Sequence, residues 1–168
     1  TAARRLATPH GGVPERVDQT LPALAELAAQ RRGELTVACL EQLTVGLLAQ
    51  ALATAGGSSE WFRGGVVCPD LAACRRVLDL RVDAAVEEAT AALAARAVAA
   101  RFGADVGVAA LGVPCGSTAE RPPGTVVIGW SVGRSTHAET LQFPGDDTLR
   151  DKATRAVLAR LAGALSER

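Results

Sequence analysis

Short extended runs alternate with helical runs along this chain, and this alternation limits the fold more than any other feature of the sequence. The first extended run, "ELTVACL" (34–40), is followed by "TVGLLAQALATAGG" (44–57), whose apolar residues recur at helical spacing before two glycines. Helices that lie between strands in sequence cover the faces of a sheet with parallel strands. We therefore expect an α/β fold with a mixed β-sheet covered on both faces.

The remaining segments continue this pattern. Further helices are predicted over residues 20–32, 70–80, 83–102 and 146–165, and further extended segments over 58–69, 104–112, 125–132 and 135–143, with a hairpin turn at Gly133-Arg134. Residues 1–17 are rich in Arg, Gly and Pro and lack periodicity, so they are expected to form a mobile arm. Residues 18–168 are expected to form a single domain.

Composition limits the core and the partners. Hydrophobic residues make up 48% of the chain but aromatic residues only 3%, so Ala, Val and Leu must fill the core and allow close helix–sheet packing. The 18 basic and 18 acidic residues give no net basic field, and we expect no nucleic-acid partner. No apolar run reaches the roughly 18 residues that span a bilayer, and the first residues resemble no secretory signal. We expect no membrane partner and a cytoplasmic location.

The cysteines give no metal site. The chain has four Cys and two His, and no Cys-x-x-Cys pair, so the spacing predicts neither a zinc site nor any other metal or cofactor. Each Cys taken alone is most simply a small buried hydrophobe in a reducing compartment. A disulfide between Cys68 and Cys74 fits their spacing, although a cytoplasmic location argues against it.

Three stretches together resemble the CinA C-terminal domain family in their order and spacing. They are "GSSEWFRGGVV" (57–67), "GTVVIGWS" (124–131) and "FPGDDTLRDKATRAVLARLAGAL" (143–165). The resemblance covers about residues 20–165 and implies a three-layer α/β/α sandwich. The family's stand-alone enzymes hydrolyse the amide of nicotinamide mononucleotide to nicotinic acid mononucleotide and ammonia. Small homo-oligomers are common in this family, so the resemblance also implies a homo-oligomer.

The chain departs from the family at the positions that carry catalysis. The family's first motif usually reads Ala-Glu-Ser-Cys-Thr-Gly-Gly, whereas residues 40–46 read Leu-Glu-Gln-Leu-Thr-Val-Gly. Gln42 therefore stands at the position of the serine nucleophile, and Pro69 and Cys74 stand at those of a tyrosine and a lysine. The chain has no Tyr, and its single lysine, Lys152, falls on the last predicted helix. A glutamine amide has no nucleophilic oxygen, so the Ser–Tyr–Lys mechanism is absent.

Some groups at the family's pocket are retained. Donors that would suit a bound nucleotide stand at a helix N-terminus and in two loops, at Thr44, Gly46, Ser58, Ser59, Gly116 and Thr118. Each Ser or Thr could instead cap a helix or stabilise a turn. Val45 and Val113 add β-branched side chains where the family keeps glycine, which opposes close ligand approach.

Glu41 keeps the family's acidic position and has three candidate roles. It could orient a ligand group, act as general base for a water, or serve the structure by pairing with an Arg or capping a backbone donor.

The favoured interpretation is a catalytically degenerate member of the family, a pseudoenzyme that binds a pyridine nucleotide weakly or acts as an interaction module. The alternative is a divergent amidohydrolase that deamidates nicotinamide mononucleotide or a related amide, with Glu41 or a cysteine as the reacting group. A third interpretation is a scaffold whose basic arm, with Arg4, Arg5 and Arg16, contacts another protein.

Overall fold

The computed structural model describes Glu26 and residues 35–81, 85–114, 116 and 121–166. Five strands form one sheet in the order β2-β1-β3-β4-β5. They are β1 (Val37–Glu41), β2 (Phe62–Val67), β3 (Val106–Gly112), β4 (Thr125–Val132) and β5 (Ser135–Gln142). β2 and β3 run parallel to β1, whereas β4 pairs antiparallel with both β3 and β5. The predicted mixed sheet is confirmed.

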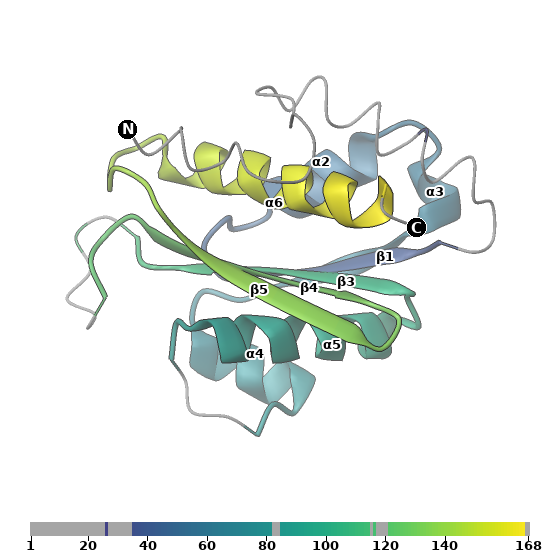
Figure 1. The fold of residues 1–168 in the computed structure, drawn as a ribbon, viewed down its shortest axis with the longest axis horizontal. Helices are drawn as coiled ribbons and strands as arrows, with labels where there is room; N and C mark the ends of the chain where they lie inside the picture. Colours follow the sequence, from purple (N-terminus) through teal and green to yellow (C-terminus); the bar gives the residue numbers. More distant parts are fainter. Residues whose placement is uncertain (1–25, 27–34, 82–84, 115, 117–120, 167–168) are drawn as a thin grey trace.

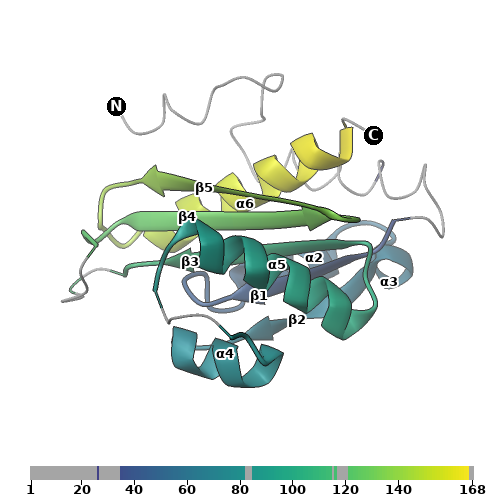
Figure 2. The same ribbon diagram turned by 60° about the horizontal axis from the view of Figure 1, so that its bottom comes forward.

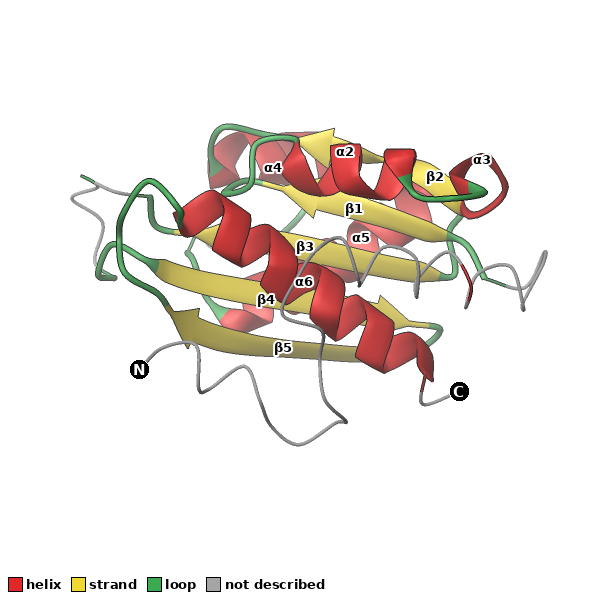
Figure 3. Ribbon diagram, turned by 90° about the horizontal axis from the view of Figure 1, so that it is seen from above, coloured by secondary structure: helices red, strands yellow, loops and turns green. Residues whose placement is uncertain are grey.

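Helices cover both faces of the sheet (Figure 1). On one face lie α2 (Leu47–Thr54) and α6 (Leu149–Ser166), and on the other lie α4 (Leu71–Leu78) and α5 (Glu88–Phe102). A single turn of helix, α3 (Ser58–Trp61), leads into β2. Seen from above, α2 and α6 cross the sheet on the same side (Figure 3). The three-layer α/β/α sandwich implied by the family resemblance is confirmed.

Two predicted boundaries differ from the structure by four or five residues. Residues 58–61 are helical instead of extended, because Gly57 adopts a left-handed conformation (φ 67°) and Ser58 closes the end of α2 by donating its hydroxyl to the Ala53 carbonyl at 2.6 Å. α5 begins at Glu88 instead of residue 83, and Glu87 before it makes no side-chain cap bond that would have marked the start. The predicted arm over 1–17 lies outside the described residues, as does the helix over 20–32 except for Glu26, which is helical.

The two faces of the sheet have different cores. Under α2 and α6 the buried side chains are large, among them Leu43, Leu48, Leu158 and Leu161. Under α5 they are mostly small, and alanines of the helix face β1, β3 and β4. Among the described residues, no helix is both long and apolar enough to cross a membrane.

Gly107 and Gly129 set the distance between α5 and the sheet. A Cβ at Gly107 would lie 1.8 Å from the carbonyl oxygen of Ala95, and one at Gly129 would lie 2.1 Å from that of Ala91. Real Cβ atoms do not approach backbone oxygens this closely, so the helix backbone rests directly on strands β3 and β4. The close helix–sheet packing expected from the small side chains is therefore confirmed on this face.

Replacing Gly129 by Ala should lower the free energy of unfolding by about 3 kcal/mol, because the helix must shift to admit the new methyl group. Urea denaturation of Gly129→Ala against the unsubstituted protein measures this. Gly163→Ala in α6 is the control, since nothing lies within 4 Å of its added Cβ, and it should stabilise the helix by roughly 0.5–1 kcal/mol. Equal stability of the two variants would contradict the close contact.

Candidate functional site

The candidate site lies between the carboxyl ends of β1 and β3. From β1 the chain passes to α2 on one face of the sheet, and it reaches β3 from α5 on the other face. The chain therefore adds β2 on one side of β1 and β3 on the other, so the connections from β1 and to β3 leave the sheet on opposite faces. Open α/β sheets bind ligands in the crevice at such a point. The residues that follow β1 and β3 at this edge begin at Gln42 and Val113.

Gln42 bridges the two strand ends. Its side-chain oxygen Oε1 accepts a hydrogen bond of 2.9 Å from the backbone N–H of Gly112, the last residue of β3. The backbone N–H groups of Gln42 and Leu43 both donate to the Ala110 carbonyl, at 3.0 and 3.2 Å. Gln42 thus connects the end of β1 to the end of β3, at the place where a ligand crevice would open.

Leu43 packs against the junction between the ends of β1 and β3. Its side chain is buried and lies so close to Gly112 that a Cβ there would be 2.5 Å from Leu43 Cδ2. The carbonyl of Leu43 accepts a hydrogen bond of 3.2 Å from Nε of Arg150, in the first turn of α6. The turn is therefore held by β3 on one side and by α6 on the other.

Glu41 is fully buried, and its carboxylate caps the N-terminus of α2. Oε2 accepts hydrogen bonds from the Thr44 hydroxyl at 2.5 Å and from the N–H groups of Gly46 and Leu48 at 2.9 and 3.0 Å, and Oε1 accepts one from the Ala49 N–H at 2.7 Å. A carboxylate in this position satisfies backbone donors and faces the positive end of the helix dipole. Glu41 thus takes the donors of Thr44 and Gly46 that were predicted to bind a ligand.

Val45 holds a backbone conformation that suits glycine. Its φ is 46°, in the left-handed region, and its side chain is half exposed. A β-branched residue in this region is strained. The turn between β1 and α2 therefore stores strain at Val45. Val113, by contrast, is buried.

The other predicted site residues are only partly gathered here. Pro69 is exposed in the turn after β2, and Gly116 is exposed with φ 73° in the loop after β3, so both lie at the carboxyl edge. Ser58 and Ser59 precede β2 and therefore lie at the amino ends of the parallel strands, away from Gln42. There the Ser58 hydroxyl bonds to the end of α2. Thr118 lies outside the described residues, and for all of these positions ligand binding stays a prediction.

The cysteines near the edge are buried free thiols. Burial, and then a thiol–thiol hydrogen bond to Cys68, raise the pKa of Cys74 to about 12. Burial, and secondarily the Glu41 carboxylate, raise the pKa of Cys39 well above its ordinary range. A nucleophilic cysteine needs a lowered pKa, so the environment of both thiols opposes reactivity. In the part of the chain that the structure describes, no three His, Cys, Asp or Glu side chains gather as metal ligands would.

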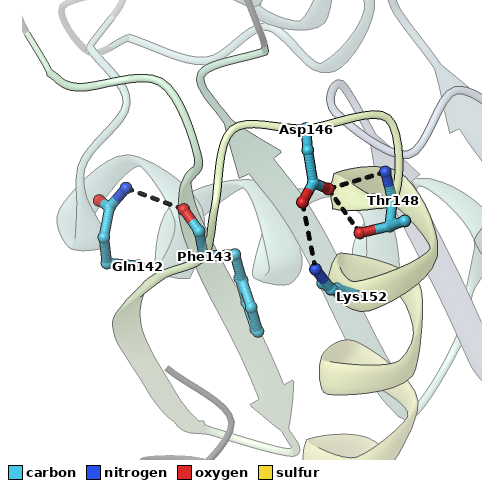
Figure 4. A network of polar contacts seen from close by, with 5 residues as sticks. All are labelled: Gln142, Phe143, Asp146, Thr148 and Lys152. Carbon is cyan, nitrogen blue, oxygen red and sulfur yellow. Dashed lines mark hydrogen bonds and ion pairs between the residues drawn. The ribbon is translucent and has the colours of Figure 1, made fainter. Parts of the chain in front are cut away.

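Polar residues at the start of α6 also belong to this edge, and the sequence patterns did not single them out. Asp146 stabilises the turn that leads into α6 by accepting from the Thr148 N–H at 2.9 Å and from its hydroxyl, and it forms an ion pair of 3.6 Å with Lys152 (Figure 4). Close by in the chain, the side-chain amide of Gln142 donates to the Phe143 carbonyl at 3.2 Å. A carboxylate two residues before a Thr that precedes a helix, in "GDDT", is a turn and capping signal that could have located this cluster.

A model of the CinA C-terminal domain matches residues 19–165 of the chain. CinA-like proteins of Salinibacter ruber and Mycobacterium marinum are each 35% identical to it, over 89% and 98% of the chain. The chain spans about 40% of the length of these curated relatives.

Solved structures show the same fold. A competence-damaged protein (CinA) superfamily protein from Escherichia coli has a TM-score of 0.83 and 27% identity, with 93% of this chain and 95% of that chain covered. A competence damage-inducible protein A from Klebsiella pneumoniae has a TM-score of 0.82 and 29% identity, with 90% and 98% covered.

Glu41→Gln should destabilise the protein by about 3 kcal/mol, since an amide group turned toward several buried N–H donors leaves at least one unsatisfied. Chemical denaturation measures the loss. Asp70→Asn is the matched control: Asp70 is exposed and caps α4 through one bond of 2.7 Å from the Ala73 N–H, and asparagine caps equally well. A loss at Glu41 no larger than at Asp70 would contradict the structural role of Glu41.

Cys74 should resist alkylation in the folded protein, because at pH 8 a thiol with a pKa of about 12 is ionised in roughly one molecule in ten thousand. Mass spectrometry of iodoacetamide-treated protein reads the modification at each cysteine, and Ser59→Cys supplies an exposed reference thiol. The raised pKa of Cys74 also makes the free energy of unfolding depend on pH, because the folded protein keeps the thiol proton above the ordinary pKa of 9.0. The stability that this thiol contributes is complete below pH 9 and is lost as the pH rises toward 12. Alkylation of Cys74 as fast as that of the reference thiol would contradict the raised pKa of Cys74.

Proposed function

Since the chain belongs to the CinA C-terminal domain family, we propose that it is a catalytically degenerate member, a pseudoenzyme that binds a pyridine nucleotide weakly or acts as an interaction module. Amide hydrolysis requires a nucleophile, a base that activates it and donors for the oxyanion. By its resemblance to the family's motifs, the chain has Gln42, Pro69 and Cys74 where the family has its Ser, Tyr and Lys.

The observation that carries this proposal is the hydrogen bond from the Gly112 N–H to the Gln42 side chain. An amide in this position offers no hydroxyl to attack a carbonyl carbon, and it engages a backbone donor at the strand end. Together with the buried Leu43 beside it, Gln42 supports a role in closing the junction between β1 and β3.

The alternative of a divergent amidohydrolase would need another reacting group. Glu41 faces four donors within the protein, and a general base needs a carboxylate with a free lone pair turned toward the substrate. Cys74 is buried with a raised pKa. These environments favour the non-catalytic proposal over the alternative.

Weak nucleotide binding finds its support at the rim of the same edge. Arg150 reaches the turn after β1 from α6 and is exposed, so it offers guanidinium N–H groups that suit a phosphate. Gly116, across the edge, is exposed in a conformation that suits glycine and brings bare backbone to the surface. A nucleotide would therefore bind at the rim, above the closed junction.

Incubation of purified protein with nicotinamide mononucleotide, followed by an ammonia assay, tests the absence of catalysis. We expect no ammonia above the buffer control. Ammonia release that co-elutes with the protein on gel filtration and disappears at its own melting temperature would overturn the proposal in favour of the amidohydrolase.

A thermal-shift assay with the same nucleotide tests weak binding. At a ligand concentration of about ten times Kd, binding should stabilise the protein by about 1.4 kcal/mol and raise Tm accordingly. Arg150→Ala should remove this shift, whereas Arg155→Ala, an exposed arginine further along α6, should leave it unchanged. No shift in the unsubstituted protein would favour the interaction module over the nucleotide binder.

A further inference from the structure

We infer that Gln42 selects among pyridine nucleotides, so that the site prefers a ring that carries a carboxylate to one that carries a carboxamide. The inference rests on the proposed nucleotide binding and specifies the chemical form of the ligand that this site takes. Figure 2 shows the place: β1 and β3 lie side by side, with α5 on one face of the sheet and α2 and α6 on the other. The selectivity follows from the orientation of one side-chain amide.

The hydrogen bond to Gly112 determines which atom of the Gln42 amide is left for a ligand. A backbone N–H can only donate, so the atom that lies 2.9 Å from it is the carbonyl oxygen Oε1. The nitrogen Nε2 carries two N–H groups, and no acceptor in the described part of the chain takes either of them. Gln42 is half-buried and Nε2 reaches solvent. The side chain therefore offers donors to a ligand.

The acceptors at the same junction are already bonded. The Ala110 carbonyl accepts the N–H groups of Gln42 and Leu43, and the Leu43 carbonyl accepts Nε of Arg150. The buried carboxylate of Glu41 accepts four donors from the turn and from α2. The positive end of the α2 dipole also stabilises this carboxylate, which reduces its repulsion of an anion at the rim. A ligand N–H group would thus meet acceptors that already have partners.

Arg150 adds positive charge beside the Gln42 amide. Its Nε bonds to the carbonyl of Leu43, the residue next to Gln42, and its side chain is exposed. In the described residues its two terminal nitrogens have no acceptor. The turn after β1 and the first turn of α6 therefore supply free N–H groups side by side, and such a set favours an anionic acceptor.

The two forms of a pyridine nucleotide differ in how they match these donors. A ring carboxylate has only acceptor oxygens, and its hydrogen bonds to N–H groups are strengthened by its charge. A ring carboxamide has one acceptor oxygen and an NH₂ group that needs an acceptor of its own. Gln42 therefore suits nicotinic acid mononucleotide better than nicotinamide mononucleotide.

Isothermal titration calorimetry of the unsubstituted protein with these two mononucleotides tests the inference, because the probes differ in a single group. We expect nicotinic acid mononucleotide to bind about tenfold more tightly, since its bonds to the donors are charge-assisted. Equal affinities, or tighter binding of the amide, would overturn the inference and leave nucleotide binding in place. Binding of neither probe would overturn the proposed nucleotide binding and the inference with it.

Gln42→Glu separates selectivity from the bridge to β3. Oε1 of the glutamate can still accept the Gly112 N–H, whereas its second oxygen puts a charged acceptor where Nε2 was a donor. We expect the affinity for nicotinic acid mononucleotide to fall about tenfold or more, with no loss of affinity for the amide. Gln50→Glu, at an exposed position of α2, adds the same charge and should keep the preference for the acid. An unchanged preference for the acid in Gln42→Glu would overturn the inference.

Discussion

The bonds of the Glu41 carboxylate hold the candidate site in its present form. A charged group with no exposure to water is stable only when it is fully hydrogen bonded, and here the partners are a hydroxyl and the first N–H groups of α2. The same residue ends β1, and its carbonyl accepts the Cys68 N–H at 2.9 Å. One residue thus fixes the end of a strand, the start of a helix and the turn after β2.

The placement of Gln42 follows from this cap. Because Glu41 fixes where β1 ends and α2 begins, the next side chain is directed toward the end of β3, and its amide finds the Gly112 N–H there. In a family member with serine at this position, the shorter side chain would not span the same gap. The end of β1 and the start of α2 therefore position Gln42 for a structural contact with β3.

Sequence patterns predicted the order of the helices and strands better than they predicted where helices begin and which candidate site residues lie together. The strands and the hairpin at Gly133-Arg134 follow from β-branched runs and turn residues, which are local signals. The start of α5 could not be predicted, because residues 83–102 are rich in helix formers and Glu87 makes no side-chain cap bond. The separation of Ser58 from Gln42 could not be predicted either. Because β1 and β2 are parallel, Gln42 follows the carboxyl end of β1 and Ser58 lies before the amino end of β2. The bonds of Glu41 depend on helix geometry that a sequence motif does not contain.

The left-handed backbone of Val45 makes two substitutions in this turn unequal in their effect on stability. Val45→Gly would release strain, because the backbone already holds a conformation that suits glycine. Gln42→Ser would instead remove the bridge to β3 and leave the Gly112 N–H without this acceptor. The turn thus tolerates a change at Val45 more readily than one at Gln42, whose side chain holds the two strand ends together.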